Sequence, residues 1–447
     1  MNGRVHKLPM GLIAFSCVVL FLSANVGLAS GQEGGIDFTS SPNPLGSGAR
    51  ALGMGGAFIA VADDATAASW NPGGLIQLER PEISVVGEGI YRAEDNKFLE
   101  RPEGSGKQTT SNAALNYLSA SYPFTLLDRN MIVSFNYQHL YDFSRKWQIG
   151  LQSFRPSMTT DWTFEADGGL YAYGFAYAVQ IIPQLSFGFT LNFWQDGIYE
   201  NGWQNTTKWH VLVIPRAGQW FTQDYQRQDR YSFTGFNANV GLLWNVNERL
   251  TFGATLKTPF TGSVRHTFEA VTIDQYSDPA WNSRPYRRRG TSFYDLSMPM
   301  SYGFGLAYRF SDRLTLSADF YRTEWQDFVL TTSKGTEFSA LSGLPKAQSD
   351  VDPTNQVHVG VEYLFIKPKF TVPLRAGFFY DPGPAEKSPD DYYGFSFGTG
   401  IGIGRFVFDL AYVFRFGNDV KETLVEGVTF SQDVTEHAFY SSLIVHF

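Results

Sequence analysis

Alternation of apolar and small or polar residues at every second position is the feature that most constrains the fold of this chain. Between residues 185 and 193, Leu, Phe, Phe, Leu and Phe occupy one phase, and Ser, Gly, Thr and Asn occupy the other. The same pattern recurs at 302–310, 357–365 and 406–415. Successive side chains of a β-strand point to opposite faces, so a period of two predicts strands with one apolar face.

A soluble β-sandwich also alternates, and the second face distinguishes it from a membrane barrel. A sandwich keeps that face well charged, because water covers it. Here the second face is mostly Gly, Ala, Ser, Thr and Asn, and charged residues are only 17% of the chain. A cation on the lipid face costs about 2–4 kcal/mol at mid-membrane, and Lys257, Arg309, Arg375 and Arg415 fall on the other phase. The pattern favours an all-β, closed, antiparallel transmembrane β-barrel with a polar lumen.

About fourteen strands are expected, an even number as in bacterial single-chain barrels. They centre on 81–92, 113–124, 130–143, 169–181, 184–199, 233–246, 250–260, 300–310, 314–328, 356–365, 372–381, 394–403, 406–416 and 438–447. Short joints with turn residues, such as Ser311-Asp312, alternate with long segments, the longest being Glu200–Ser232 and Thr261–Pro299. Short joints belong to the periplasmic rim and long loops to the outside, so both termini are expected in the periplasm.

The two ends of the chain indicate an exported outer-membrane protein of a Gram-negative cell. Basic residues followed by an apolar run at 11–22 and by small residues predict a signal peptide over residues 1–30. The single cysteine, Cys17, lies within it, so the mature chain offers no thiolate metal site and no disulfide. The last strand ends on Phe447, and such an ending resembles the segment that the outer-membrane assembly machinery recognises. A formal charge of −8 argues against nucleic acid as a partner.

The segment before the first strand has a different composition, rich in Gly and Ala. It contains Gly48-Ala49-Arg50-Ala51-Leu52-Gly53-Met54-Gly55-Gly56-Ala57, Ala62-Asp63-Asp64-Ala65 and Trp70-Asn71-Pro72-Gly73-Gly74-Leu75. These motifs resemble the N-terminal plug of the FadL-type outer-membrane transporters of long-chain fatty acids and other hydrophobic compounds. The resemblance implies a hatch over residues 31–80 inside a fourteen-stranded barrel over 81–447. The family's Asn-Pro-Ala turn reads Asn71, Pro72, Gly73 here, and these three are the expected gating residues.

The same resemblance assigns ligand capture to a hydrophobic groove in the third and fourth external loops. The third loop carries more apolar surface than a loop in water needs, and the fourth adds aromatic residues and an arginine cluster suited to a carboxylate or phosphate. The expected binding residues are Trp203, Trp209, Leu212, Ile214, Trp220, Phe221, Trp281, Tyr286, Arg287, Arg288 and Phe293. Two other readings stay open: the aromatic residues pack together or anchor in the lipopolysaccharide layer, and the arginines bind its phosphates.

Three functions are compatible with these observations. The first is transport of a hydrophobic small molecule through a hatch-gated barrel, the second a secretion-associated or structural barrel that binds protein clients, and the third a general porin. An enzyme is not expected, because the histidines of the mature chain are scattered and no Gly-x-Ser-x-Gly motif or paired metal-ligand spacing occurs. No cofactor or metal is expected either.

Overall fold

The structure is a computed structural model, and it describes residues 27–28, 43, 45–99, 102–154, 157–420, 425–426 and 430–447. The predicted signal peptide lies outside the described residues except for Gly27–Leu28, and so does the start of the predicted hatch, apart from Asn43. The two residues of β1 (Gly27–Leu28) pair with β21 (Val425–Glu426) in a small separate sheet.

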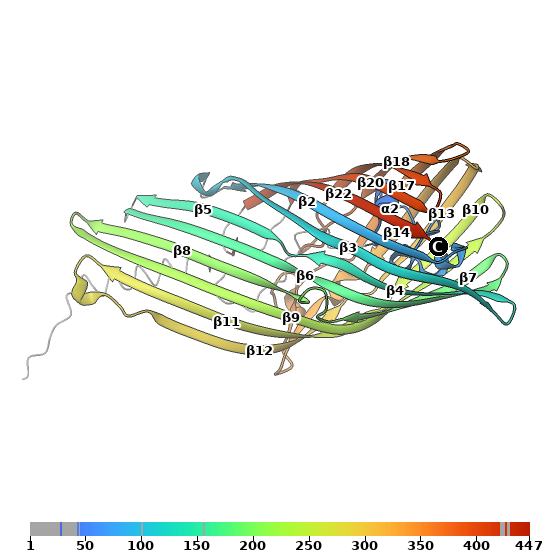
Figure 1. Cartoon of the computed structure of the whole chain (residues 1–447). Helices are drawn as coiled ribbons and strands as arrows, with labels where there is room; N and C mark the ends of the chain where they lie inside the picture. The colour runs from blue at the N-terminus through green and yellow to red at the C-terminus, as the bar shows by residue number, and fades with distance from the viewer. Residues whose placement is uncertain are drawn as a thin grey trace, which may run out of the picture.

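Fourteen antiparallel strands close into a barrel, which confirms the predicted class and strand count (Figure 1). In order around the wall they are β2 (Glu82–Phe98), β3 (Gly106–Leu126), β4 (Arg129–Asp142), β6 (Ser157–Ile182), β7 (Leu185–Trp194), β9 (Gln219–Asn245), β10 (Leu250–Lys257), β13 (Ser301–Ser311), β14 (Leu314–Thr323), β17 (Thr354–Ile366), β18 (Thr371–Tyr380), β19 (Tyr392–Ile403), β20 (Phe406–Val420) and β22 (Phe430–His446). β22 pairs with β2 to complete the ring. Closure gives each of the fourteen strands a paired neighbour on both sides, and unpaired backbone groups would be costly in a membrane.

The wall has two faces, as the alternation predicts. On β20, Phe406, Phe408 and Leu410 are 42–46% exposed on the outer surface, whereas Asp409 between them is 1% exposed inside. The large exposed side chains of the neighbouring strands are likewise Phe, Leu, Ile, Val and Tyr. The apolar rows therefore face the lipid, and the small and polar phase faces the lumen.

A hatch fills the lumen near the end of the barrel that holds the C-terminus (Figure 1). It is built from α2 (Ala49–Gly53), α3 (Ala67–Trp70) and η1 (Pro72–Gln77), and positions nearer the other end are described as above it. Its small residues pack around fully buried Met54, Phe58 and Trp70. Gly53 and Gly55 come so close to the wall that an added Cβ would lie 3.0 Å from the Cα atoms of Gly398 and Gly377 respectively. Gly55 also has a φ of +69°, which side chains rarely tolerate.

The predicted external loops 200–232 and 261–299 are wrong as loops, because most of their residues form long β-hairpins. β8 (Gly202–Arg216) pairs with the first half of β9, and β11 (Phe260–Tyr276) pairs with β12 (Tyr286–Met298). With β5 (Arg145–Phe154), they extend one side of the wall well beyond the barrel, at the end opposite the C-terminus (Figure 1). We call this extension the external sheet. The short strands β15 (Val329–Thr332) and β16 (Glu337–Ser339) pair beside the end of β12 that joins the barrel. Short 3₁₀ turns complete the chain: η2 (Pro102–Gly104), η3 (Pro279–Trp281), η4 (Trp325–Asp327) and η5 (Lys346–Gln348).

Candidate functional site

Ion pairs hold the hatch against the wall. Arg50 of α2 lies 2.9 Å from Glu362, which also pairs with Arg375 at 2.6 Å. Arg375 in turn contacts Asp409 at 2.5 Å. The hatch arginine thus shares its acceptor with a wall arginine, and moving the hatch would break this charge network between hatch and wall.

Two other charged residues of the wall, Asp319 and Arg309, make no ion pair with the hatch among the described residues. Asp319 accepts the backbone N–H groups of Phe58 (2.6 Å) and Ile59 (2.8 Å), so it holds the hatch through its backbone. Arg309 lies exposed at the end of β13, and within the described residues it makes no ion pair with the hatch.

The predicted gating turn is buried and anchored on both sides. The Asn71 side chain donates to the carbonyl oxygens of Ile59 (2.8 Å) and Leu242 (3.0 Å), and its Oδ1 accepts the Gly73 N–H. One wall residue that contacts the turn is a glycine, Gly188. A side chain would not fit there, because a Cβ on Gly188 would lie 2.4 Å from the Pro72 carbonyl oxygen. This turn is therefore a main point of attachment between hatch and barrel.

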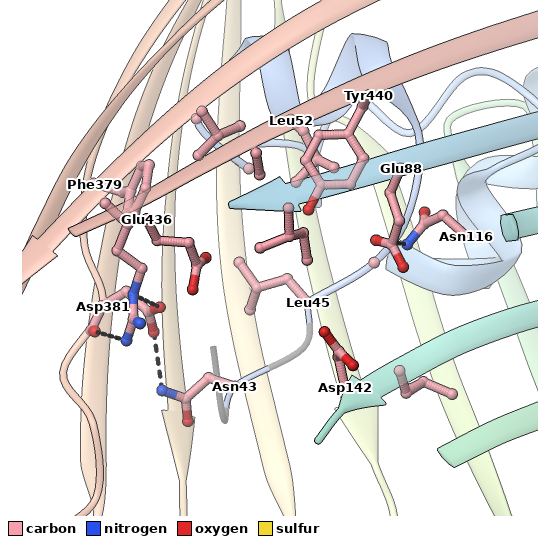
Figure 2. A pocket seen from close by; sticks show the side chains of 18 of the residues that line it. Asn43, Leu45, Leu52, Glu88, Asn116, Asp142, Phe379, Asp381, Glu436 and Tyr440 are labelled. Atoms are coloured by element: carbon pink, nitrogen blue, oxygen red, sulfur yellow. Dashed lines mark hydrogen bonds and ion pairs between the residues drawn. The ribbon is translucent and has the colours of Figure 1, made fainter. Parts of the chain in front are cut away.

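Above the hatch lies a cavity of about 140 Å³, bounded by residues of β2, β3, β4, β17, β20 and β22 and by the segment after β18 (Figure 2). Leu45 and Leu52 of the hatch give it an apolar floor. Four carboxylates reach it from the wall: Glu88, Asp142, Asp381 and Glu436. An apolar surface with a few convergent polar groups is the usual composition of a small-molecule site.

The carboxylates of this cavity differ in how well they are paired. Asp381 accepts Asn43 Nδ2 at 2.9 Å and lies 3.0 Å from Arg415. Glu88 accepts Asn116 Nδ2 at 2.8 Å and contacts His139 Nδ1 at 2.5 Å. Glu436 lies 3.6 Å from Arg92, too far for a hydrogen bond.

The cavity adjoins a seam in the barrel wall, where β3 and β4 separate. The two strands pair from the short turn between them up to Tyr117 and Gln138. Above that level β3 pairs only with β2, and β4 pairs only with β6. Both strands have a register shift near this point, as expected of β-bulges that bend a strand. Among the described residues only side chains bridge the seam, such as Asn112 to Asp142 at 3.1 Å.

His139 stands in this seam and connects its two sides. Its ring stacks on Tyr171, 4.7 Å between centroids, on the face of β6 opposite the hatch-packed Ala176. Its Nδ1 faces Glu88, which lines the cavity, and its Nε2 faces the Tyr141 carbonyl oxygen at 2.8 Å. A carbonyl and an ionised carboxylate both accept hydrogen bonds, so when Glu88 is ionised both ring nitrogens donate and the imidazole is a cation.

The predicted binding residues are divided between the interior and the surface of the external sheet. Trp203 is buried, stacked between Phe143 and Tyr231 at 4.7 and 4.6 Å. Phe221 is also buried, and Trp209 stacks on Tyr225 at 3.7 Å. The side chains of these three residues point to the same inner face of the external sheet.

The other predicted residues are more exposed, and several point away from that interior. Ile214 and Trp220 lie on the phase opposite to Trp203, as does the half-buried Leu212. Trp281, Tyr286 and Phe293 are 51–63% exposed near or on β12. Arg287 pairs with Glu269 at 3.2 Å in an exposed position, and Arg288 is exposed as well. None of the eleven predicted binding residues lines the cavity described above.

Residue patterns did not single out Glu88, His139, Asn116 or Glu436, which surround the cavity and the seam. Glu88 and Glu436 stand among small and polar residues on the inner phase of their strands, so an acidic residue at a lumen position was the available signal. The predicted third strand contains no Gly or Pro, and nothing in its composition marked the bulge beside His139.

Comparison with known proteins places these features in a family. The family model described as outer membrane protein transport protein (OMPP1/FadL/TodX) matches residues 44–393. A FadL homologue from Pseudomonas aeruginosa is 14% identical, with 90% of this chain and 98% of that one covered and a TM-score of 0.57. The toluene transporter TodX of P. putida is 15% identical, with 91% and 99% covered and a TM-score of 0.57.

The monoaromatic hydrocarbon channel CymD is also 15% identical, with 91% and 98% covered and a TM-score of 0.53. A search of curated protein sequences finds no match. At these identities the solved structures support the fold alone, whereas the family model spans more than half of the chain. The chain therefore belongs to the FadL/TodX family of outer-membrane transport proteins, a non-enzymatic family of channels for hydrophobic compounds.

Proposed function

We propose that this protein takes up hydrophobic small molecules from outside the cell, holds them in the cavity above the hatch and releases them sideways through the seam between β3 and β4. The observation that carries the proposal is the position of the cavity: Asn116 on β3 and Gln138 and His139 on β4 belong both to its lining and to the edges of the seam. A ligand that leaves through the seam enters the apolar part of the outer membrane directly. It then avoids the hatch entirely.

The tight contact between hatch and wall supports a sideways route. For a ligand to pass straight to the periplasm, Asn71, Pro72 and Gly73 would have to leave Gly188 and Gly241, and Arg50 would have to leave Glu362. The turn contacts are buried and the contact of Arg50 with Glu362 is partly buried, so all of them would have to be broken together in a closely packed interior. Opening the seam changes side-chain contacts such as Asn112 to Asp142 and the buried pair of Glu88 and His139, but it breaks no ladder of backbone hydrogen bonds between β3 and β4.

Capture from solution is assigned to the exposed apolar residues of the external sheet. Ile214, Trp220, Trp281, Tyr286 and Phe293 present apolar area outside the membrane, where it is unfavourable unless a ligand or a lipid covers it. Trp209 leads from this surface to the interior. The buried Trp203 and Phe221 hold the sheet together and so keep the capture residues in position.

Long-chain fatty acids and single-ring hydrocarbons are both candidate substrates. The named solved structures include a toluene transporter and a monoaromatic hydrocarbon channel, which supports the second class. We further propose that Arg287 and Arg288 contact lipopolysaccharide phosphates, and that the last strand is recognised by the outer-membrane assembly machinery.

A reversible bridge across the seam tests the lateral route. Asn112→Cys with Asp142→Cys places two thiols on opposite sides of the seam, and a short reducible bis-maleimide joins them. The matched control is Lys97→Cys with Asp433→Cys, because these residues lie on paired strands β2 and β22 with no seam between them. Toluene uptake into cells is expected to fall to background when the seam is bridged and to recover on reduction. Uptake that continues through the bridged seam, with the control also active, would overturn the lateral route.

A further inference from the structure

We infer that the cavity above the hatch receives the polar end of its ligand as a hydrogen-bond donor, an amine or a hydroxyl, and disfavours a carboxylate. The inference rests on the proposed function and narrows its candidate substrates, because it disfavours fatty acids and favours ring compounds or amphiphiles whose polar end is an amine or a hydroxyl. It follows from which polar atoms of the cavity lack a partner.

Three buried acceptor atoms at the cavity have no hydrogen-bond partner among the described residues. They are Oε2 of Glu436, Oδ1 of Asn116 and Nε2 of His358. The three residues are only 8%, 7% and 3% exposed. Buried polar atoms in folded proteins are nearly always paired, so three such atoms at one cavity indicate a missing donor.

The chemical roles of these atoms are fixed by their neighbours. His358 Nδ1 lies 2.6 Å from the Gly55 carbonyl oxygen, which only accepts, so Nδ1 carries the proton and Nε2 offers a lone pair. Asn116 donates Nδ2 to Glu88, which leaves its Oδ1 as an acceptor. A fourth atom without a hydrogen bond, Arg415 Nε, is a donor, but it is ion-paired with Asp381 at 3.0 Å.

The charges around the cavity also favour a hydrogen-bond donor over a carboxylate. Four carboxylates line the cavity, against the cations Arg415 and His139. Arg92, next to Glu436, is closer to Glu94, at 2.7 Å. A ligand carboxylate would therefore meet like charges and acceptors, whereas an ammonium or hydroxyl group would supply the donor that the acceptors lack.

Size limits what can enter. The volume of about 140 Å³ is close to that of a cavity of about 150 Å³ known to bind benzene. One ring with its polar substituent, or the head of a longer amphiphile, would fill it. Leu45 and Leu52 provide the apolar contact for such a ring.

Three ligands that differ only in their polar end test the inference: 4-phenylbutylamine, 4-phenylbutan-1-ol and 4-phenylbutyrate. Binding is measured by calorimetry on the full mature chain in phosphatidylcholine nanodiscs, and empty nanodiscs give the partition into lipid. The amine and the alcohol are expected to bind about tenfold or more tighter than the acid, the factor that a hydrogen bond to a charged acceptor typically contributes.

Glu436→Gln removes the charge without changing the shape, and it is expected to lower the amine-to-acid ratio about tenfold. Glu269→Gln, on the exposed hairpin, is the matched control and should leave the ratio unchanged. If Glu436→Gln does not fold, Asn116→Leu replaces it, and the alcohol should then bind several-fold more weakly. Equal binding of all three ligands, or equal ratios in both glutamine variants, would overturn the inference alone. Failure of all three to bind would overturn the proposed function as well.

Discussion

The close contact between hatch and wall depends on individual glycines on both sides. Gly53 and Gly55 in the hatch meet Gly398 and Gly377 in the wall, and a Cβ on Gly377 would lie 2.2 Å from the Gly55 backbone nitrogen. The need for small residues in the hatch was predictable from its Gly-rich motif. Their partners in the wall were not, because they are hundreds of positions away and glycine recurs on several other wall strands.

Gly377→Val is expected to displace the hatch and make the barrel leaky. The side chain would clash with backbone on a segment that cannot relax, and overpacking of this kind costs about 1–3 kcal/mol. Conductance in planar bilayers should rise from a closed baseline to open-channel events. Gly89→Val is the control, since a Cβ there meets nothing within 4 Å. If both variants remain equally closed, hatch packing does not seal the lumen.

At the scale of elements, the membrane strands were predictable and the external sheet was not. Lipid on one side and a polar lumen on the other impose strict alternation, as on β7 and β20. Outside the membrane, water contacts both faces, so β9 begins with mixed residues such as Gln226 to Arg230 that carry no period-two signal. The bulge in β4 also escaped prediction, because it forms at Leu140 without glycine or proline and follows from the pairing partners of the strand.

The external sheet is held by stacked aromatic residues that cross its strands. Phe143, Trp203, Tyr231 and His266 stack in sequence at 4.7, 4.6 and 4.3 Å. Cross-strand aromatic pairs are a main source of sheet stability. Trp203, an expected residue of the ligand groove, lies in the middle of this stack.

Trp203→Ala is therefore expected to loosen the external sheet by about 3–5 kcal/mol, the usual cost of removing a buried Trp. Trypsin should cut faster after Arg227 and Arg230 on the neighbouring strand. Trp220→Ala, at an exposed position of the same hairpin, should change the free energy of local unfolding by less than about 0.5 kcal/mol. Equal protease resistance of the two variants would contradict the structural role of Trp203.

At the scale of the whole molecule, the even strand number determines which ends of the strands lie together. The first wall strand starts beside the last residue, with the Phe447 N–H bonded to the Pro81 carbonyl oxygen at 3.0 Å. Short turns such as 312–313 lie at this end, and the long hairpins lie at the other (Figure 1). The sequence allowed this arrangement to be predicted because turn lengths and strand count are local features. The route of the ligand was not predictable, since it depends on where two strands part and on which lumen residues converge there.

The direction of the barrel in the membrane is predicted from these turn lengths, with short turns and both termini in the periplasm. Two single-cysteine variants test it: Ala280→Cys on η3 between β11 and β12, and Asp312→Cys in the turn between β13 and β14, both exposed positions. A membrane-impermeant maleimide should label Ala280→Cys in intact cells and Asp312→Cys only after the outer membrane is permeabilised. Cysteines are preferable to a C-terminal tag, because a tag would alter the end of β22 that assembly is proposed to require. Labelling in the reverse order would place the external sheet in the periplasm, and capture of ligand from outside the cell would then have no structural basis.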